Sequence, residues 1–454
     1  MSGDRLTTLD ASFLEVESAT AHMHVGWAAL FSPPAGEPAP SFEQLRKHIE
    51  SRLDRAPRYR QKLAGVPWGA NDPVWIDDEQ FDVTRHVLRA RDSEWGELVD
   101  RAMSAPLGRG RPLWELWIAD RLPDGRIGVI GKAHHCMVDG LAAVELAALL
   151  LDATPEAPDA GPEIWEAEKS PGGRRLLVEG VVGRFQEAFE LARLPTQLLR
   201  HPRRVLGLAD KALQVLRAAA RSAEPAASSM VFNEPNSPRR HLASVQRPLE
   251  DLQRIKRRFD TTINDVVLTV ASGGVRSFLV EQGETPVRLK AMVPVSMRRA
   301  NNTGELGNQI SFIFVGLPCD EPDPVRRLRD VKGTMSDRKR RGEPEGAGAM
   351  LKLLGYAPHV LQHAVSHMMA SQRAFNLTVS NIPGPREPLY MLGCELEEVY
   401  PVVPTSDDHA VSIGLTTIKD RAFFGIYADR HSLPDADLLA RGIEESIDEL
   451  LALT

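Results

Sequence analysis

The chain has 454 residues, of which 43% are hydrophobic and 26% are charged. These proportions are typical of a globular protein and exclude a disordered or fibrous one, and the length predicts two or three domains. The 55 basic and 62 acidic side chains give a net charge of −7, which offers no reason to expect a nucleic-acid partner.

Cysteine usage and the first residues predict the compartment. Cys136, Cys319 and Cys394 are far apart and form no CxxC pair, unlike a disulfide framework or a zinc site. The start, MSGDRLTTLDASF, has neither the basic residues nor the apolar stretch of a secretory signal. Apolar runs such as 147–153 are far shorter than the ~18–20 residues that a membrane-spanning helix needs. We therefore expect a cytoplasmic protein that meets lipid only from the side.

In the first 152 residues, predicted strands alternate with predicted helices. Ser41 followed by Gln44 is the pattern of a capping box, which begins a helix. Aromatic and β-branched residues favour strands around a Pro-Leu-Trp sequence and directly before a pair of histidines. The predicted strands are 23–31, 112–122 and 126–135, and the predicted helices are 41–53 and 140–152.

The middle of the chain differs in composition. Residues 153–163 and 222–240 are rich in proline, alanine and polar residues, which is typical of linkers. Between them, residues 173–221 are predicted to form amphipathic helices. This segment holds ten Arg or Lys and four acidic residues, a local charge of +6 within a net-acidic chain.

The last third returns to alternating helices and strands. It contains predicted helices at 261–283 and 434–453, predicted strands at 290–298 and 375–388, and a predicted hairpin at 409–429 that turns near Lys419–Arg421. The fold class is therefore α/β or α+β.

These elements suggest two domains, 1–155 and 241–454, joined by a linker and amphipathic helices at 156–240. The chain contains no GxGxxG, GxxxxGKS/T or GxSxG sequence. A nucleotide-binding fold or a serine hydrolase would therefore lack its usual signature.

The sequence AHHCMVDG at 133–140 combines two adjacent histidines with an aspartate–glycine pair. Metal sites usually draw ligands from one face, as in HExxH, whereas His134 and His135 point to opposite faces of an extended chain. The thiol of Cys136 likewise points away from His135, which favours a buried structural cysteine over a nucleophile. Neither a shared metal ion nor covalent catalysis is favoured.

General base catalysis fits this motif better. A neutral imidazole with a pKa near ~6.5 is suited to removing a hydroxyl proton near pH 7. One histidine would face a cavity while its neighbour packs on the other side, with Asp139 holding the loop and Gly140 allowing a tight turn. On residue types alone, two hydrogen-bonded core histidines at the end of a strand remain the alternative.

The motif HHxxxDG (134–140) is the signature of the CoA-dependent acyltransferase superfamily, and companion motifs narrow the resemblance. In chain order they are LDASFL (9–14), MHVG (23–26), PLW (112–114), NDVVL (264–268), PVSMR (294–298), GELGNQIS (304–311) and SNIPGP (380–385). Together they resemble the bacterial wax ester synthase/acyl-CoA:diacylglycerol acyltransferase family over nearly the whole chain.

This resemblance implies two chloramphenicol-acetyltransferase-like domains with a tunnel between them. It also implies that His135 is the general base, and that His134, Asp139 and Gly140 support its loop. The base would take the hydroxyl proton of an acceptor alcohol that attacks an acyl-CoA thioester. That mechanism involves no acyl-enzyme, no metal and no cofactor, since acyl-CoA is a substrate.

Further site residues follow from the companion motifs. Asn264 is the candidate oxyanion donor, with Asp265 beside it, and a helix cap formed after two threonines is the structural alternative. Arg298 is expected either to pair with Asp139 or to be exposed. Residues expected to shape the acyl channel or brace the motif strand, with core packing as the alternative, are Pro112, Leu113 and Trp114. Residues expected to fix a loop near the tunnel are Asn381, Pro383 and Gly384.

The implied function is transfer of a long-chain acyl group from acyl-CoA to diacylglycerol or a fatty alcohol, which makes triacylglycerol or wax ester. The alternatives are a polyketide-associated or condensation-type transferase that uses carrier-protein thioesters, and an inactive lipid-binding relative. Residues 173–221 are expected either to lie on an anionic inner membrane or lipid inclusion, or to form a solvated bridge between the domains.

Overall fold

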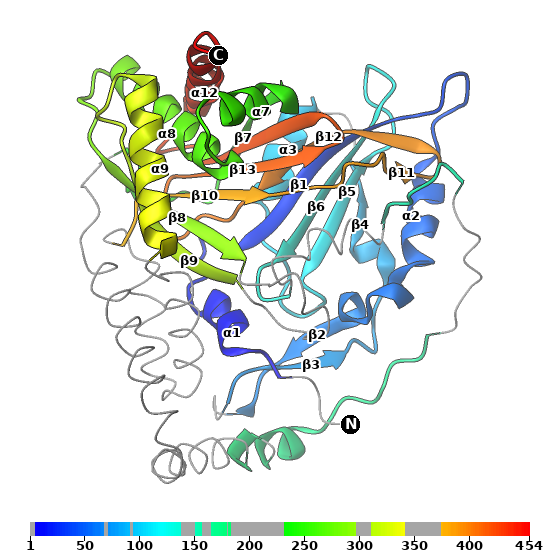
Figure 1. Cartoon of the computed structure of the whole chain (residues 1–454). Coiled ribbons are helices and arrows are strands. Elements are labelled where there is room, and N and C mark those ends of the chain that lie inside the picture. Colours follow the sequence, from blue (N-terminus) through cyan, green and yellow to red (C-terminus); the bar gives the residue numbers. More distant parts are fainter. Residues whose placement is uncertain are drawn as a thin grey trace, which may run out of the picture.

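The computed structural model describes residues 5–67, 71–90, 94–137, 150–156, 165–178, 180–182, 231–296, 310–340 and 374–454. Within them the chain forms two six-stranded sheets and a small two-stranded one, with helices packed around them (Figure 1). The α/β class predicted from the sequence is confirmed. The predicted helix at 140–152 and most of the basic segment 173–221 lie outside the described residues.

The first sheet contains the strands that lead to the histidine motif. Its order is β11 (Tyr390–Met391), β12 (Cys394–Val402), β1 (His24–Ser32), β6 (Ile127–His134), β5 (Trp114–Ala119) and β4 (Val87–Arg89). Strands β1 and β6 are antiparallel and place His24 opposite His134, while β5 places Trp114 opposite Ala133. Glycine at 26 and 131 lets these strands pack closely, since a side chain at Gly26 would lie 2.6 Å from the carbonyl oxygen of Gly131.

Helices and a short hairpin cover the first sheet. They are α1 (Thr8–Glu15), α2 (Phe42–Glu50), α3 (Trp95–Ser104), the 3-10 turns Leu53–Arg55, Pro57–Arg60 and Val83–Arg85, and the pair β2 (Gln61–Ala64) and β3 (Val74–Asp77). The capping box predicted at Ser41 and Gln44 is confirmed, with both reciprocal hydrogen bonds present. It begins α2, whose residues Phe42, Leu45 and Ile49 face the core.

The second sheet lies in the C-terminal part of the chain. Its order is β7 (Arg240–Pro248), β14 (Arg421–Asp429), β13 (Val411–Ile418), β10 (Leu377–Ile382), β8 (Leu289–Ser296) and β9 (Ile310–Leu317). The predicted hairpin is confirmed as β13 and β14, and it turns at Lys419, whose φ of 53° is left-handed. The helices around this sheet are α7 (Leu249–Arg258), α8 (Ile263–Glu281), α9 (Pro324–Arg340) and α12 (Ala436–Leu451).

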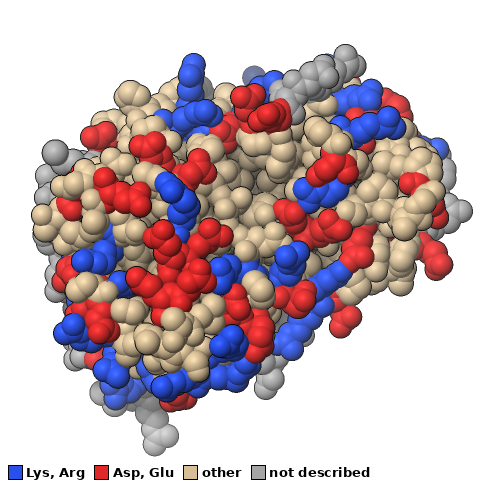
Figure 2. Space-filling view, turned by 90° about the horizontal axis from the view of Figure 1, so that it is seen from above, with Lys and Arg blue, Asp and Glu red and all other residues tan. Residues whose placement is uncertain are grey.

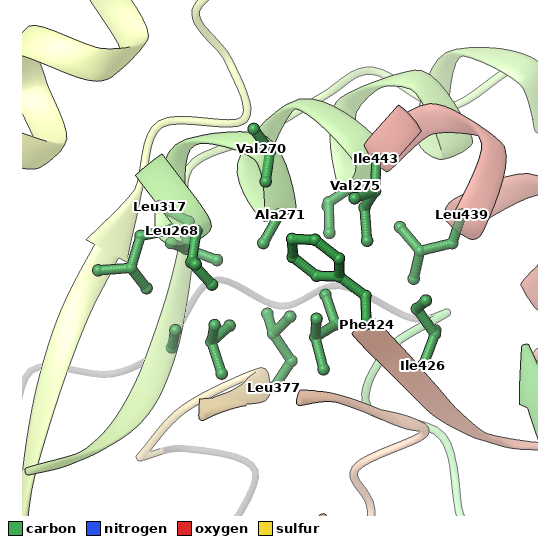
Figure 3. Close-up of a cluster of buried hydrophobic side chains, with 14 of the residues drawn as sticks. Leu268, Val270, Ala271, Val275, Leu317, Leu377, Phe424, Ile426, Leu439 and Ile443 are labelled. Atoms are coloured by element: carbon green, nitrogen blue, oxygen red, sulfur yellow. The ribbon is translucent and has the colours of Figure 1, made fainter. Parts of the chain in front are cut away.

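Helix α8 is the centre of the second core. Its side chains Leu268, Ala271 and Val275 pack against Phe424 of β14, and α12 contributes Ile443 (Figure 3). By length and composition alone, α8 is the one described helix that could cross a membrane, yet most of it is buried inside the protein. Its apolar character is therefore explained by packing in the core.

Two strands from the C-terminal range complete the first sheet. Strand β12 pairs with β1 along most of its length, and β11 extends the same edge (Figure 1). Where β12 passes the hairpin of the second sheet, Pro401 approaches Gly425 so closely that a Cβ there would lie 2.0 Å from the Pro401 carbonyl oxygen. The predicted C-terminal domain, 241–454, therefore also supplies two strands, within residues 390–402, to the first sheet.

Several other elements were absent from the sequence prediction: strands β2, β3, β4, β7, β9, β11 and β12, and helices α1, α3, α7 and α9. Charged side chains of both signs are interspersed on the face seen in Figure 2. Some of them tie elements together, as where Arg247 at the end of β7 pairs with Asp448 of α12 at 2.5 Å. Such exposed pairs contribute little to stability individually.

Candidate active site

The two motif histidines lie at the end of β6 and at the start of the turn that follows it, and this histidine loop is held by its backbone. The amide of His134 donates to the carbonyl oxygen of Leu113 at 2.9 Å, and the amide of His135 donates to that of Met23, also at 2.9 Å. Met23 has a left-handed φ of 48°, which is uncommon for a non-glycine residue and orients its carbonyl towards the loop. The loop is thus tied to the residues that precede β5 and β1 at the same time.

The imidazole of His135 lies against the aromatic ring of Phe13 from α1. The two ring centroids are 3.7 Å apart with an interplanar angle of 16°, so one face of the imidazole is covered. Its Nδ1 atom is buried and has no hydrogen-bond partner among the described residues. Burial lowers the pKa of His135 to about 4, so this imidazole is neutral at pH 7 and can accept a proton.

His134 has a different environment. Its ring meets that of His24 edge-on, with centroids 6.4 Å apart, and its Nδ1 accepts the amide N–H of Cys136 at 3.1 Å. Burial, together with the charge of Arg109, lowers the pKa of His134 to about 3. The two adjacent histidines therefore have separate ring neighbours, in line with the expected alternation, and the ring of His135 lies against Phe13 of α1.

The structure also bears on the two other kinds of chemistry considered for this motif. The Cys136 side chain is buried, and burial raises the pKa of its thiol far above the usual range, so it is not a thiolate at neutral pH. Among the described residues, no group of three or more His, Cys, Asp or Glu is arranged to hold a metal ion. Asp139, Gly140 and Arg298 lie outside the described residues.

The Pro-Leu-Trp sequence braces the histidine strand. Leu113 and Trp114 are both buried, and the Leu113 carbonyl accepts the His134 amide as described above. The Trp114 indole N–H donates to the carbonyl of Tyr59 at 2.8 Å, and its ring stacks on His86 at 4.7 Å. The carbonyl of Pro112 accepts the Trp114 amide. These contacts match the bracing and packing interpretations, and none of them places the three residues on a channel.

Asn264 and Asp265 have different roles at the start of α8. The Asp265 carboxylate accepts the amide of Thr262 at 3.0 Å and the hydroxyl groups of Thr261 and Thr262, each at 2.8 Å. Asp265 therefore completes a capping box, which is the structural alternative considered for this motif, and its inclusion among the catalytic residues stays a prediction. Asn264 is exposed, and its Oδ1 accepts from the amide group of Asn381 at 2.5 Å.

This amide pair joins two motifs that are more than a hundred residues apart. Asn381 is the next-to-last residue of β10, and Pro383 and Gly384 follow the end of the strand. The Gly384 amide donates to the Thr417 hydroxyl at 3.2 Å, and a Cβ at Gly384 would lie 2.0 Å from the Thr417 carbonyl oxygen. Close packing thus explains Gly384, while the bond to Asn381 leaves the Nδ2 group of Asn264 able to donate to another group.

Three residues of the site were not singled out from the sequence. Phe13 and Met23 occur in the quoted motifs LDASFL and MHVG, so their positions were flagged but their roles were not. Glu17, whose carboxylate lies 3.6 Å from Nε2 of His134, carried no local signal. All three precede β6 by more than a hundred residues, so that only tertiary contacts bring them to the histidines.

Known proteins give an independent comparison. Residues 6–267 match the family model of the wax ester synthase/diacylglycerol acyltransferase catalytic domain, and residues 306–451 match the model of the WS/DGAT C-terminal domain. A probable diacylglycerol O-acyltransferase of Mycobacterium tuberculosis is 33% identical over an alignment that covers 99% of this chain and 96% of the relative.

Solved structures agree with this comparison. The wax ester synthase/diacylglycerol acyltransferase from Marinobacter aquaeolei VT8 is 25% identical, with a TM-score of 0.68 and 98% of both chains covered. The trichothecene 15-O-acetyltransferase from Fusarium sporotrichioides has a TM-score of 0.63 at 11% identity and covers 98% of this chain and 94% of its own. This second likeness shows a shared fold.

The covered ring of His135 predicts the pH dependence of the reaction. The pKa of about 4 lies below the ordinary ~6.5, so the neutral base is present above pH 4 and is lost as the pH falls through that value. We expect kcat/KM to stay constant down to about pH 5. In Phe13→Ala, water reaches the ring, and the acid limb of the kcat/KM profile should move up towards ~6.5. Phe13→Leu keeps the apolar cover, so its acid limb should stay near that of the unmodified protein.

Activity regained on return to pH 7 serves as the control for unfolding in acid. An acid limb near 6.5 in the unmodified protein, or one that Phe13→Ala does not move, would contradict this account of the site.

Proposed function

The chain belongs to the wax ester synthase/diacylglycerol acyltransferase family, and from that membership we propose the following reaction and residue roles. The protein is an acyl-CoA-dependent O-acyltransferase. We propose that it moves a long-chain acyl group to the hydroxyl of diacylglycerol, and that fatty alcohols serve as a second class of acceptor. The name of the mycobacterial relative supports diacylglycerol, and the name of the Marinobacter enzyme supports both acceptors.

The observation that carries the mechanism is the neutral, covered imidazole of His135. It accepts the hydroxyl proton of the acceptor as the alcohol oxygen attacks the thioester carbonyl. The tetrahedral intermediate then collapses, the carbon–sulfur bond breaks, and the imidazolium returns its proton to the departing thiolate. The products are an ester and CoA with a free thiol, so the base ends the cycle neutral and no cofactor is required.

Asn264 is proposed as the donor to the oxyanion of the tetrahedral intermediate. Its Oδ1 is occupied by Asn381, which orients the amide and leaves Nδ2 as the donating group. An amide fixed before the reaction begins needs no reorganisation when charge develops on the carbonyl oxygen. Asn381 thus supports Asn264 in this proposal and does not touch the reacting atoms.

We also propose that the protein is cytoplasmic and binds the surface of the inner membrane or of lipid inclusions through a segment formed by the helical residues 173–178 and 180–182. Val178, Val181 and Val182 are 61%, 40% and 48% exposed, which is unusual for apolar side chains grouped on one short segment. Exposed arginines at 174 and 175 lie in the same segment and suit anionic headgroups.

This segment is held against the first half of the protein. Leu176 is buried, and the Asn71 amide donates to the Gly180 carbonyl at 3.0 Å. In Figure 1 the segment lies at the periphery of the molecule, away from the second sheet. A surface that receives the acceptor lipid would therefore be presented by a fixed part of the protein.

His135→Ala tests the assigned base. With palmitoyl-CoA and either dioleoylglycerol or hexadecanol, we expect the rates of thiol release and of neutral lipid formation to fall together by roughly 10²–10⁴-fold. Cys136→Ala is the matched control in the same loop and should keep activity within about threefold, because its thiol is not a nucleophile. Full turnover by His135→Ala, or no turnover by the unmodified protein with either acceptor, would refute the mechanism.

Flotation with liposomes tests the surface proposal. Liposomes rich in phosphatidylglycerol should carry the unmodified protein, and replacing Val178, Val181 and Val182 by Asp should abolish flotation, because charged side chains do not enter the apolar layer. The control is Val280→Asp with Val287→Asp, which changes two valines of similar exposure in the other half. Loss of flotation in the control, or unchanged flotation in the triple variant, would overturn the proposed surface.

A further inference from the structure

Glu17, Arg109 and His134 form a line of contacts behind the histidine loop that the proposed mechanism does not use. The Glu17 carboxylate pairs with the Arg109 guanidinium, and its Oε1 lies 3.6 Å from Nε2 of His134. The His134 side chain is 1% exposed and that of Glu17 is 18% exposed, so the contact lies inside the protein. Arg109, at 46%, is the solvent-facing end of the line.

The hydrogen bond on the other side of His134 determines where its proton lies. The backbone amide of Cys136 can only donate, so Nδ1 of His134 must offer a lone pair to it. The neutral ring then carries its single proton on Nε2, the atom that faces Glu17. No hydrogen-bond partner within the described chain is close enough to accept this buried N–H, and Glu17 is the carboxylate next to it.

The segment that carries Glu17 is itself fixed by the C-terminal half. The hydroxyl groups of Ser18 and Thr20 both donate to Oδ1 of Asp407, at 2.8 and 2.9 Å. Arg240 donates to the Thr20 carbonyl. Glu17 therefore joins the histidine loop to a segment that both halves of the protein hold in place.

We propose that Glu17 is a positioning residue for the acyl transfer reaction. Its carboxylate, held by Arg109, fixes the ring of His134 and through it the loop that presents His135. This role rests on the proposed function of His135 as the base. The 3.6 Å separation exceeds a hydrogen bond by about half an ångström, and such contacts often tighten only when substrate is bound.

One short stretch of chain supplies a separate neighbour for each of the two histidines. Phe13, in the last turn of α1, covers the imidazole of His135, and Glu17, four residues later, faces that of His134. Loss of the carboxylate removes the acceptor nearest the Nε2–H of His134 and frees the ring to move. Because displacements of about 1 Å near a reacting group can reduce the rate as much as 10²-fold, the effect should appear in kcat.

Steady-state kinetics with palmitoyl-CoA and dioleoylglycerol test the role of Glu17. We expect Glu17→Ala to lower kcat by about 10- to 100-fold and Glu17→Gln by less, because an amide oxygen still accepts. The KM for palmitoyl-CoA should stay within about twofold, and the melting temperature of Glu17→Gln should be unchanged. Glu43→Gln, which removes an exposed carboxylate paired with Arg46, is the control and should keep the original kcat.

A double-mutant cycle tests whether Glu17 acts through His134. In His134→Asn, the side-chain oxygen can still accept the Cys136 amide, but no ring N–H faces Glu17. If the inference is right, adding Glu17→Gln to His134→Asn lowers kcat by no more than about twofold further. If the reductions of kcat in the two single variants multiply fully in the double variant, Glu17 does not act through His134. An unchanged kcat in both Glu17→Gln and Glu17→Ala would overturn the role of Glu17 itself.

His135→Ala, measured in the same assay, separates this inference from the proposed function. Full activity in His135→Ala would refute the assignment of His135 as the general base. An inactive His135→Ala together with fully active Glu17 variants refutes only the positioning role. Glu17→Gln keeps the side-chain volume, so its kcat tests the positioning role of Glu17 if Glu17→Ala does not fold.

Discussion

Two backbone hydrogen bonds determine the geometry of the reaction centre. The amides of His134 and His135 donate to carbonyl oxygens on two different neighbours, Leu113 and Met23, and these bonds fix the loop in position and direction. Phe13 can cover the imidazole of His135 only because the loop is held in this way, and that cover keeps the base neutral. The chemistry proposed here depends first on a fixed backbone and second on the burial of a ring.

The exchange of strands between the two halves supports that fixed loop. Strand β12 comes from the C-terminal range, yet it pairs with β1, the strand whose first residue lies opposite His134. Pro401 of β12 packs on Gly425 of the second sheet at a distance that no larger residue would allow. A change in how the halves meet would therefore be transmitted to β1, and from β1 to the histidine loop.

Local signals in the sequence predicted the elements that local interactions stabilise. The capping box at Ser41, the hairpin turning at Lys419 and the buried helix α8 all follow from residues adjacent in the chain. The crossing of β12 into the first sheet and the approach of Glu17 to His134 depend on contacts between residues more than a hundred positions apart, which periodicity does not encode. The cap formed by Asp265, by contrast, involves only the two threonines that precede it in the chain, and the sequence already offered it as the structural alternative.

In the proposed reaction the acyl group passes directly from acyl-CoA to the acceptor hydroxyl, and the neutral imidazole of His135 only takes up and returns the proton. Rapid mixing of the protein with palmitoyl-CoA, in the absence of any acceptor, tests this most directly, with free thiol followed over time and the intact mass of the protein measured. Direct transfer predicts no stoichiometric burst of thiol and no mass increase. A burst of one thiol per protein, accompanied by a palmitoyl adduct on the chain, would contradict it.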